Sequence, residues 1–466
     1  MRRCRTAGAF VLIAVANMLA QSPLPRAPHA SIQTVSPLGG HYSEPGIAIN
    51  PRNPQQIVAV FQGGAAVQGI SSAVYSNDSG KTFTLAQGTK AAEWKVAGDV
   101  STAFDNKGNA FLCYLTFDRL GTSSYWAHAA GRNGIFVRRS NDGGKIWDKQ
   151  ATALKEFATD NAPGMQFEDM PRIFADVSSG SPYAGNLYVG WIEWQLTQSI
   201  MLFSRSVDAG KTWSAPIRIS THAGLPRDDN GSVGGIAMGI DRKGTIYAIW
   251  HDGNSIVLTT SHDGGKSFEA SRPVIETAPP YFGEVPGVSR VEGFPQIAVD
   301  ARGQGKLYVC WSDYRNGDID VFLASSADSG RTWSKPMRVN SDTIHNGKDQ
   351  FYQWMAVDSV TNNLYVDFYD RRDDPKNIKV GVTLARSTDG GRTFTNYAWT
   401  QNAFDPGGAF LGDYTWIAAH NDHVYAAWTA TAPQKPAPKG KNPAEHSTRR
   451  TETIIVIGTA DFSQPR

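Results

Sequence analysis

An eight-residue pattern, Ser-x-Asp-x-Gly-x-(Thr/Ser/Ile)-(Trp/Phe), occurs six times in this chain and constrains its fold more than any other feature. The copies, termed boxes below, begin at Ser76, Ser140, Ser206, Ser261, Ser326 and Ser387. Successive boxes begin 55 to 66 residues apart, longer than the roughly 20 to 45 residues of a solenoid repeat and suited to a four-stranded sheet with its loops. Each box has the composition of a hairpin turn, because Ser and Asp oxygens accept backbone N–H groups and Gly supplies positive φ. We expect the boxes to be structural, one in each sheet.

A second repeat counts the sheets independently. Short apolar segments that end in Asp, Asn or His occur at 47–50, 102–105, 173–176, 238–241, 297–300, 355–358 and 417–420. Each is followed by a turn and by a strand rich in β-branched and aromatic residues, at 57–61, 110–114, 187–191, 246–250, 307–311, 364–368 and 424–428. This composition between turn residues is typical of strands. The pattern therefore predicts seven units, although only six carry a box.

The seventh unit lacks one strand, and the beginning of the chain offers a replacement. The apolar stretch 453–457 leads to Phe462 with no box after it, and the stretch 31–35 precedes the first unit. Pairing the two would cover a sheet edge that is otherwise open to aggregation. The sequence predicts an all-β seven-bladed propeller of four-stranded antiparallel blades, closed by the N-terminal strand, as one domain over residues 31–463. Six blades with an appendage are the alternative.

The first 20 residues differ from the rest of the chain. Arg2, Arg3 and Arg5 precede an apolar run at 9–16 and further apolar residues up to Ala20, which is the order of a secretory signal peptide. The run is too short to span a bilayer comfortably. We expect residues 1–20 to be a signal peptide, cut after Ala16 or Ala20, and the mature protein to be secreted or periplasmic without an integral membrane span. An uncleaved anchor is the alternative.

Charge and cysteine content narrow the possible partners. Removal of three arginines and no acids takes the formal net charge from +2 to about −1, which does not suggest nucleic acid or an acidic membrane as a partner. Cys113 and Cys310 fall in equivalent strands of different units, so we expect no disulfide between them and no zinc site. No loop has the ligand spacing of a known calcium site, although a calcium ion held by the acidic residues is the alternative. We expect a monomer that needs no cofactor.

Acidic, aromatic and arginine side chains gather at the end of the units opposite the boxes, termed the mouth face below. The segments that lead into the first strands carry Glu44, Asp99, Glu168, Asp169, Asp228, Asp229, Glu292, Asp349 and Asp413, with Phe294, Tyr352 and Tyr414 beside them. The segments that follow the second strands carry Asp118, Arg119, Glu193, Trp194, His251, Asp252, Asp313, Tyr314, Arg315 and the run 369–374. Rings stack on sugar faces, and two carboxyl groups about 5 to 10 Å apart can flank a glycosidic bond. The mouth face thus predicts a glycan site.

We select site candidates from this face. The catalytic candidates are Asp99, Asp313, Tyr369 and Asp370. The substrate-binding candidates are Arg290, Glu292, Arg315, Asp349, Arg371, Asp413, Tyr414 and Trp126, the last from an insertion at 118–134. For each acidic residue the structural alternative is a turn cap or a surface ion pair worth at most about 1 kcal/mol.

The boxes, the leader and the predicted ring together resemble the sialidase-like superfamily of secreted bacterial Asp-box (BNR-repeat) propellers, over essentially the whole mature chain. The matching residues are those of the turns, so the resemblance implies the fold and, as an expectation, an exo-sialidase-like glycoside hydrolase that acts on a glycan or glycoconjugate. Sialidases have six blades, an arginine triad, an Arg-Ile-Pro motif, a Tyr/Glu nucleophile pair and an Asp acid/base. The string most similar to Arg-Ile-Pro is Pro171-Arg172-Ile173, which has a different residue order and lies in the third unit rather than near the first. No motif assigns the arginine or tyrosine roles of sialidases to Arg290, Arg315, Arg371, Arg372, Tyr369 or Tyr414.

Two functions remain open on the sequence. One is a glycoside-cleaving enzyme, and the other is a non-catalytic propeller that binds glycan or protein through the same face. A strongly raised carboxyl pKa beside a second carboxyl group in the mouth would favour the enzyme.

Overall fold

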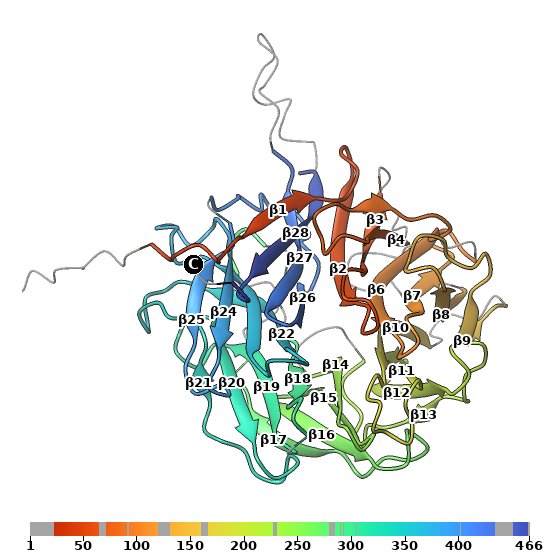
Figure 1. Ribbon diagram of the computed structural model, residues 1–466. Helices are drawn as coiled ribbons and strands as arrows, with labels where there is room; N and C mark the ends of the chain where they lie inside the picture. The colour runs from red at the N-terminus through yellow and green to blue at the C-terminus, as the bar shows by residue number, and fades with distance from the viewer. Residues whose placement is uncertain are drawn as a thin grey trace, which may run out of the picture.

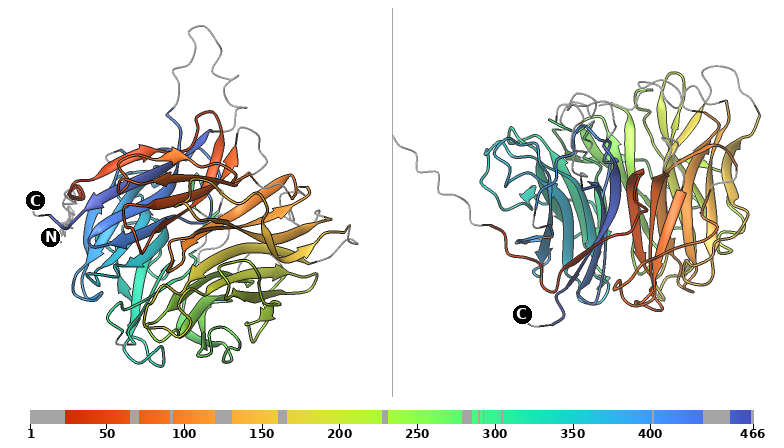
Figure 2. Two further views of the ribbon diagram at one scale, coloured as in Figure 1. Left: turned by 45° about the vertical axis from the view of Figure 1, so that its right-hand side comes forward. Right: turned by 90° about the horizontal axis from the view of Figure 1, so that it is seen from above.

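Seven four-stranded antiparallel sheets stand around a central axis within the described residues of the computed structural model (Figure 1), and Figure 2 shows them side by side as the blades of a propeller. The structure describes residues 23–64, 71–90, 93–119, 131–159, 166–226, 231–278, 285–288, 290–291, 293–303, 305–400, 402–433 and 451–464. The expected signal peptide and the candidates Trp126 and Glu292 lie outside these ranges. The prediction of seven sheets is confirmed, and the six-bladed alternative is wrong.

The first four sheets follow chain order from the axis outward. Sheet one contains β2 (His41–Ile49), β3 (Ile57–Gly64), β4 (Ser71–Ser76) and β5 (Thr84–Leu85). Sheet two contains β6 (Val96–Phe104), β7 (Ala110–Phe117), β8 (Asn133–Ser140) and β9 (Thr152–Phe157). Sheet three contains β10 (Phe167–Ala175), β11 (Leu187–Trp194), β12 (Ser199–Ser206) and β13 (Ile217–Arg218). Sheet four contains β14 (Val233–Ile240), β15 (Ile246–Asp252), β16 (Ser255–Ser261) and β17 (Arg272–Glu276).

Sheets five and six repeat this arrangement, and sheet seven departs from it. Sheet five contains β18 (Gln296–Val299), β19 (Leu307–Asp313), β20 (Asp320–Ser326) and β21 (Met337–Arg338). Sheet six contains β22 (Gln350–Val357), β23 (Leu364–Asp370), β24 (Gly381–Ser387) and β25 (Thr395–Ala398). Sheet seven contains β26 (Trp416–His420), β27 (His423–Thr431), β28 (Thr453–Asp461) and, outermost, β1 (Ser31–Thr34).

The outer strand of sheet seven comes from the N-terminal part of the chain. In the antiparallel pairing of β1 with β28, Ser31 lies opposite Thr459 and Thr34 opposite Val456. The amide of Val35 continues the ladder by donating to the Ile455 carbonyl at 2.9 Å. Backbone groups along β28 that would otherwise form a free edge are thus paired.

The second strand of each sheet is buried on both faces, which explains its dense apolar sequence. Each such strand carries an aromatic residue that is at most 1% exposed, at its fifth position in sheets one to six and at its sixth in sheet seven: Phe61, Tyr114, Trp191, Trp250, Trp311, Phe368 and Trp428. These rings fill the space between neighbouring sheets and form the core of the ring. No helix long and apolar enough to cross a membrane occurs among the described residues.

The six boxes form the turns between third and fourth strands. In each box the Ser hydroxyl donates to the Asp carboxylate and accepts the amide of the Gly four residues after the Ser. That Gly has positive φ, for example +80° at Gly210. The closing aromatic side chain is fully buried at Trp147 and half-buried in the other five boxes. The boxes therefore hold the hairpins together by side chain to backbone hydrogen bonds more than by burial of their rings.

Acidification should weaken these turns. Hydrogen bonds from the side chain and amide of Thr82 and from Ser76 lower the pKa of Asp78 to about 2, against about 3.9 in an unfolded chain. A lowered folded-state pKa means that the stabilisation is present above the unfolded value and is lost as the pH falls towards 2. Asp78→Asn should cost about 1 kcal/mol at pH 7, and the difference from the wild type should shrink between pH 5 and pH 2. Urea unfolding across this range checks it, and a pH-independent difference would contradict it.

Candidate functional site

The first strands bend at their mouth ends through a repeated irregularity. The register of β2, β6, β10, β14 and β22 shifts at this point, and one residue in each adopts positive φ. In β2 and β6 that residue is acidic: Glu44 has φ 55° and Asp99 has φ 48°. Such φ values are uncommon outside glycine, and a bulge re-aims the side chain at its position. The irregularity therefore brings two carboxyl groups from neighbouring sheets into one place.

Glu44 and Asp99 share a hydrogen bond and are nearly inaccessible, with relative exposures of 2% and 6%. Burial, reinforced by the nearby Asp413 carboxylate, raises the pKa of Glu44 to about 8. Burial and the charge of Glu44 raise the pKa of Asp99 as well. Two carboxyl groups in hydrogen-bond contact cannot both ionise at neutral pH, so the pair retains a proton.

The segment leading into β26 closes over this pair. Asp413 accepts a bidentate ion pair from Arg290, with 2.7 Å between Nε and Oδ1. The Arg290 side chain is 18% exposed, and its guanidinium lies 5.4 Å from the centre of the exposed Phe410 ring. A Cβ atom at Gly412 would lie 2.7 Å from Cγ of Glu44, so a glycine is required where this backbone passes the acid.

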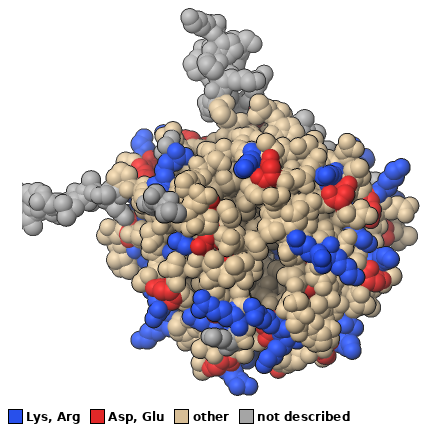
Figure 3. Space-filling view, in the orientation of Figure 1, with Lys and Arg blue, Asp and Glu red and all other residues tan. Residues whose placement is uncertain are grey.

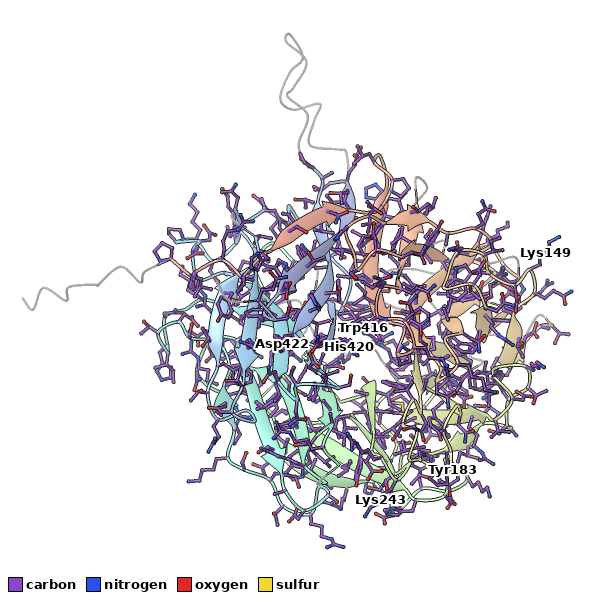
Figure 4. All side chains as sticks on the ribbon, in the orientation of Figure 1. Lys149, Tyr183, Lys243, Trp416, His420 and Asp422 are labelled. Atoms are coloured by element: carbon purple, nitrogen blue, oxygen red, sulfur yellow. The ribbon has the colours of Figure 1, made fainter. Side chains whose placement is uncertain are left out.

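A second arginine approaches from sheet three. Arg172 on β10 is 3% exposed, and its guanidinium lies 3.9 Å from the Tyr414 ring centre and 5.9 Å from that of Trp416, which lies near the axis (Figure 4). The Tyr414 hydroxyl donates to the Val100 carbonyl at 3.4 Å, and burial raises its pKa. Tyr414 is therefore a neutral ring beneath a cation rather than an ionised nucleophile. We term Glu44, Asp99, Arg172, Arg290, Asp413 and Tyr414 the mouth cluster.

Gln62 fixes the two bulges relative to each other. Its amide oxygen accepts the backbone N–H of Asp99 at 2.8 Å, and its amide nitrogen donates to the Ser43 hydroxyl at 3.1 Å. One side chain from β3 thus holds the residue before Glu44 and the backbone of Asp99, so it positions both acids.

Four sequence candidates meet in the mouth cluster: Asp99, Arg290, Asp413 and Tyr414. Glu44 belongs to the acids predicted for the mouth face but not to the site candidates, and Arg172 lies in the Pro171-Arg172-Ile173 string that differs in order and unit from the sialidase motif. A usable signal was present, since Glu44 and Asp99 both lie three residues before their apolar segments.

The Asp313 and Arg315 candidates form a closed ion pair after β19. Arg315 Nε lies 2.8 Å from Asp313 Oδ1, and the indole of Trp311 donates to the same carboxylate at 2.8 Å. The guanidinium also donates to the Glu276 carbonyl at 2.9 Å. These contacts bind the end of sheet five to that of sheet four and do not involve the mouth cluster.

The candidates near the end of β23 are likewise bound within the scaffold. Asp370 accepts Arg372 Nε at 2.5 Å and the Thr383 hydroxyl at 2.7 Å, while the buried Tyr369 hydroxyl donates to the Thr429 carbonyl at 2.6 Å. Arg371 is fully buried and donates to the carbonyls of Pro286 and Asn377 at 2.7 and 2.9 Å. Asp349 lies 3.7 Å from Arg371 and accepts the amide of Ile319 at 3.1 Å.

A further acid pair at the mouth face carries its own counter-ion. Glu168 is fully buried, burial raises its pKa to about 8, and Lys155 lies 3.1 Å away while also pairing with Glu193. The lysine crosses from β9 to β10 and β11, so this group joins sheets two and three. Among the described residues no group of three or more His, Cys, Asp or Glu is arranged to hold a metal ion.

Asp367 is a buried carboxyl group of a different kind. It lies in the middle of β23, and neither oxygen has a hydrogen-bond partner in the described part of the chain. The neighbouring Thr415 hydroxyl donates instead to the Tyr352 carbonyl at 2.8 Å. Burial raises the Asp367 pKa well above its usual value, so the folded protein holds this group as the neutral acid.

Stability should therefore fall as the pH rises above about 4, because the unfolded chain releases the Asp367 proton and the folded chain retains it. The slope for one proton approaches about 1.4 kcal/mol per pH unit. Asp367→Asn should remove this slope. The free energy of unfolding of the variant should therefore rise relative to that of the wild type between pH 5 and pH 8. Chemical unfolding at several pH values measures it, with the exposed Asp373→Asn as control. A constant difference between Asp367→Asn and the wild type would mean that Asp367 is ionised in the fold.

Comparison with known proteins gives similarity in structure only. No protein-family model and no curated protein matches the chain. The Hadza microbial sialidase is 16% identical with a TM-score of 0.48, over 86% of this chain and 73% of that one. The phage phi92 endosialidase is 10% identical with a TM-score of 0.49, over 94% and 70%. An ulvan lyase is 12% identical with a TM-score of 0.49, over 90% and 93%. Similarity of this degree concerns the fold alone, and no activity of this chain follows from it.

Proposed function

We propose that this protein is a secreted glycoside-cleaving enzyme whose acid–base group is the Glu44–Asp99 carboxyl pair. The observation that supports it is a buried glutamic acid with a pKa of about 8 in hydrogen-bond contact with a second acid and near two arginines. A group that keeps its proton at neutral pH can protonate a leaving glycosidic oxygen, while water adds to the anomeric carbon as the C–O bond breaks. Paired carboxyl groups with raised pKa values occur preferentially at active sites.

The geometry defines how the pair would work. Hydrolases that use two separate carboxyl groups hold them about 5 Å or more apart, whereas Glu44 and Asp99 contact each other. They would therefore act as one proton donor and acceptor, as coupled acids do. Arg290 and Phe410 lie outermost, with exposures of 18% for the Arg290 side chain and 38% for Phe410. In this proposal the ring stacks on a sugar and the guanidinium donates to its oxygens.

A non-catalytic binding propeller is the second candidate. It is favoured by the internal pairing of the arginines, since Arg290 is bound to Asp413 and Arg172 stacks on Tyr414. Charges already satisfied inside the protein are typical of a scaffold as well as of an active site. This candidate takes a glycan or a protein on the mouth face without turnover.

Secretion is part of the proposal and depends on the leader. Residues 1–20 have the charged and apolar order of a signal peptide. We propose that they are removed and that the mature chain is a monomer. N-terminal sequencing of the exported protein and its mass in solution would check both statements.

Incubation of the mature protein with a panel of sialosides and plant and microbial polysaccharides tests the activity. We expect release of reducing ends from at least one substrate, with a rate that falls as the pH rises through about 8 because the proton donor is lost. Asp99→Asn should abolish the release, whereas Asp373→Asn, an exposed acid beyond β23, should not. Binding without turnover by the wild type would replace the enzyme with the second candidate.

A further inference from the structure

The face that carries the boxes, termed the box face, presents a ring of exposed cations, while the Asp residues of its turns are buried or half-buried and exposed acids such as Asp148 and Glu269 lie beyond the boxes. The sixth residue of every box is a lysine or arginine, and all six are exposed: Lys81, Lys145, Lys211, Lys266, Arg331 and Arg392. The turns after the first strands add five more exposed cations, Arg52, Lys107, Arg242, Lys243 and Arg302. None of the eleven forms an ion pair within the described residues.

The turn geometry produces this separation of charge. In three boxes the Asp carboxylate accepts the backbone N–H of the cationic residue itself, for example Lys145 to Asp142 at 3.0 Å. The turns after the first strands do the same, as with Lys243 to Asp241 at 2.8 Å. A carboxylate that binds the backbone of its own turn lies beneath it, and these Asp residues are buried or half-buried. The side chain of the following cation is left to project into solvent.

Figure 3 looks onto the box face, the same face on which Figure 4 labels Lys243 and His420. Lys and Arg side chains lie around the rim of this face and towards the axis. Because the cations recur once or twice in most sheets, they form a broad ring rather than one pocket. A long, flexible anion with regularly repeated charges can contact many of them at once. Each contact contributes little alone, but several together give avid, salt-sensitive binding.

We propose that the box face binds a polyanionic polysaccharide, a chain of sulfated or uronate sugars, separately from any chemistry in the mouth cluster. Stacking of nucleic acid bases needs exposed rings, and the two exposed large aromatic side chains of the described chain, Tyr314 and Phe410, are both at the mouth face. Membrane insertion needs a continuous apolar face, whereas Ile146, Val207 and Val360 are exposed singly in different turns. Charge without exposed rings or a continuous apolar surface fits an anionic glycan.

The test measures binding of the full mature protein to heparin and to polygalacturonate, the sulfated and carboxylated probes, with neutral dextran as reference. We expect binding to one or both anionic chains, no binding to dextran, and an affinity that falls steadily between 50 and 500 mM salt. The box-face variant replaces Lys81, Lys145, Lys211 and Lys266 with Ser and should bind at least tenfold more weakly. The control variant replaces Lys90, Lys95, Lys376 and Lys379, exposed lysines of the mouth-side segments, with Ser and should stay within twofold of the wild type. Unfolding curves establish that both variants are folded.

Three results would overturn the proposal. They are no binding to either anionic chain at 50 mM salt, equal losses in the two variants, and binding of duplex DNA or phosphatidylserine vesicles at least as tight at the same ionic strength. Glu44→Gln should bind the polysaccharide as the wild type does. The polysaccharide site and the proposed hydrolysis can therefore fail independently.

Discussion

Glu44→Gln is expected to lower kcat for glycan cleavage by about 10²- to 10⁴-fold, the range that a positioned acid–base group contributes. Glutamine preserves the shape of the side chain and a hydrogen bond to Asp99, but it carries no transferable proton. The loss should therefore fall on kcat more than on KM. In addition, the decline in rate above about pH 8, which reflects the Glu44 pKa, should disappear from any residual activity.

The matched control for this variant is Glu269→Gln. Glu269 is exposed, beyond the box of sheet four, and its only described ion pair is a 3.4 Å contact with His262. It should retain wild-type kcat and KM. Glu44→Gln should also remain folded, because removal of a buried acid relieves a desolvation cost. A folded Glu44→Gln protein with wild-type kcat would exclude Glu44 from the acid–base group.

Arg371→Met is expected to lower the free energy of unfolding by about 3 to 5 kcal/mol, the cost of removing one partner of a buried ion pair. Arg371 is fully buried, spans from the Pro286 carbonyl to the Asn377 carbonyl, and lies 3.7 Å from Asp349. Methionine fills a similar volume but leaves both carbonyls without a donor and the Asp349 carboxylate without its counter-ion. The sequence suggested a substrate-binding role for this arginine, and the variant separates the two roles.

Denaturant unfolding measures the effect, with Arg392→Met as control. Arg392 is exposed in the last box, and its loss should change stability by no more than about 0.5 kcal/mol. A substrate-binding Arg371 would instead give a variant of normal stability with a raised KM. That outcome would contradict the scaffold role assigned to Arg371.

The repeats predicted the fold because their residues act locally. A box forms its turn from hydrogen bonds within eight residues, and the second strands are apolar throughout because both their faces are covered. The seventh sheet lacks a box, yet its first two strands follow the same pattern as the others. The pairing of 31–35 with β28 was predictable from the missing strand, since an unpaired edge is unfavourable.

The site was predicted only in part because it depends on where loops from different sheets cross. Asp99, Arg290, Asp413 and Tyr414 were chosen and do meet, but spacing alone did not indicate that Gly412 would pass directly over Glu44. The Asp313 and Asp370 groups looked functional because they recur in phase. Residues at equivalent positions of adjacent sheets also lie at equivalent contacts between neighbouring sheets. The ion pairs of Asp313 with Arg315 and of Asp370 with Arg372 lie at such contacts.

Net charge concealed the box face for a related reason. The overall balance near zero suggested no polyanionic partner of the nucleic acid or membrane type. The balancing carboxylates are buried in turns such as that of Asp105, whose exposure is 1%, while Lys107 projects outward. Sequence gives the sum of the charges, and the turn geometry decides which of them reach the surface.

Carboxyl titration by ¹³C NMR, with glutamate labelled at Cδ, examines the Glu44–Asp99 pair without reference to any substrate. Glu44 and Glu168 are both expected to titrate near pH 8, so the spectrum of Glu44→Gln identifies which signal belongs to Glu44. The predicted result is one glutamate signal with an apparent pKa near 8 that is missing from the variant. If the signal lost in Glu44→Gln instead titrates below pH 6, Glu44 holds no proton at neutral pH and is not the proton donor of the proposed acid–base group.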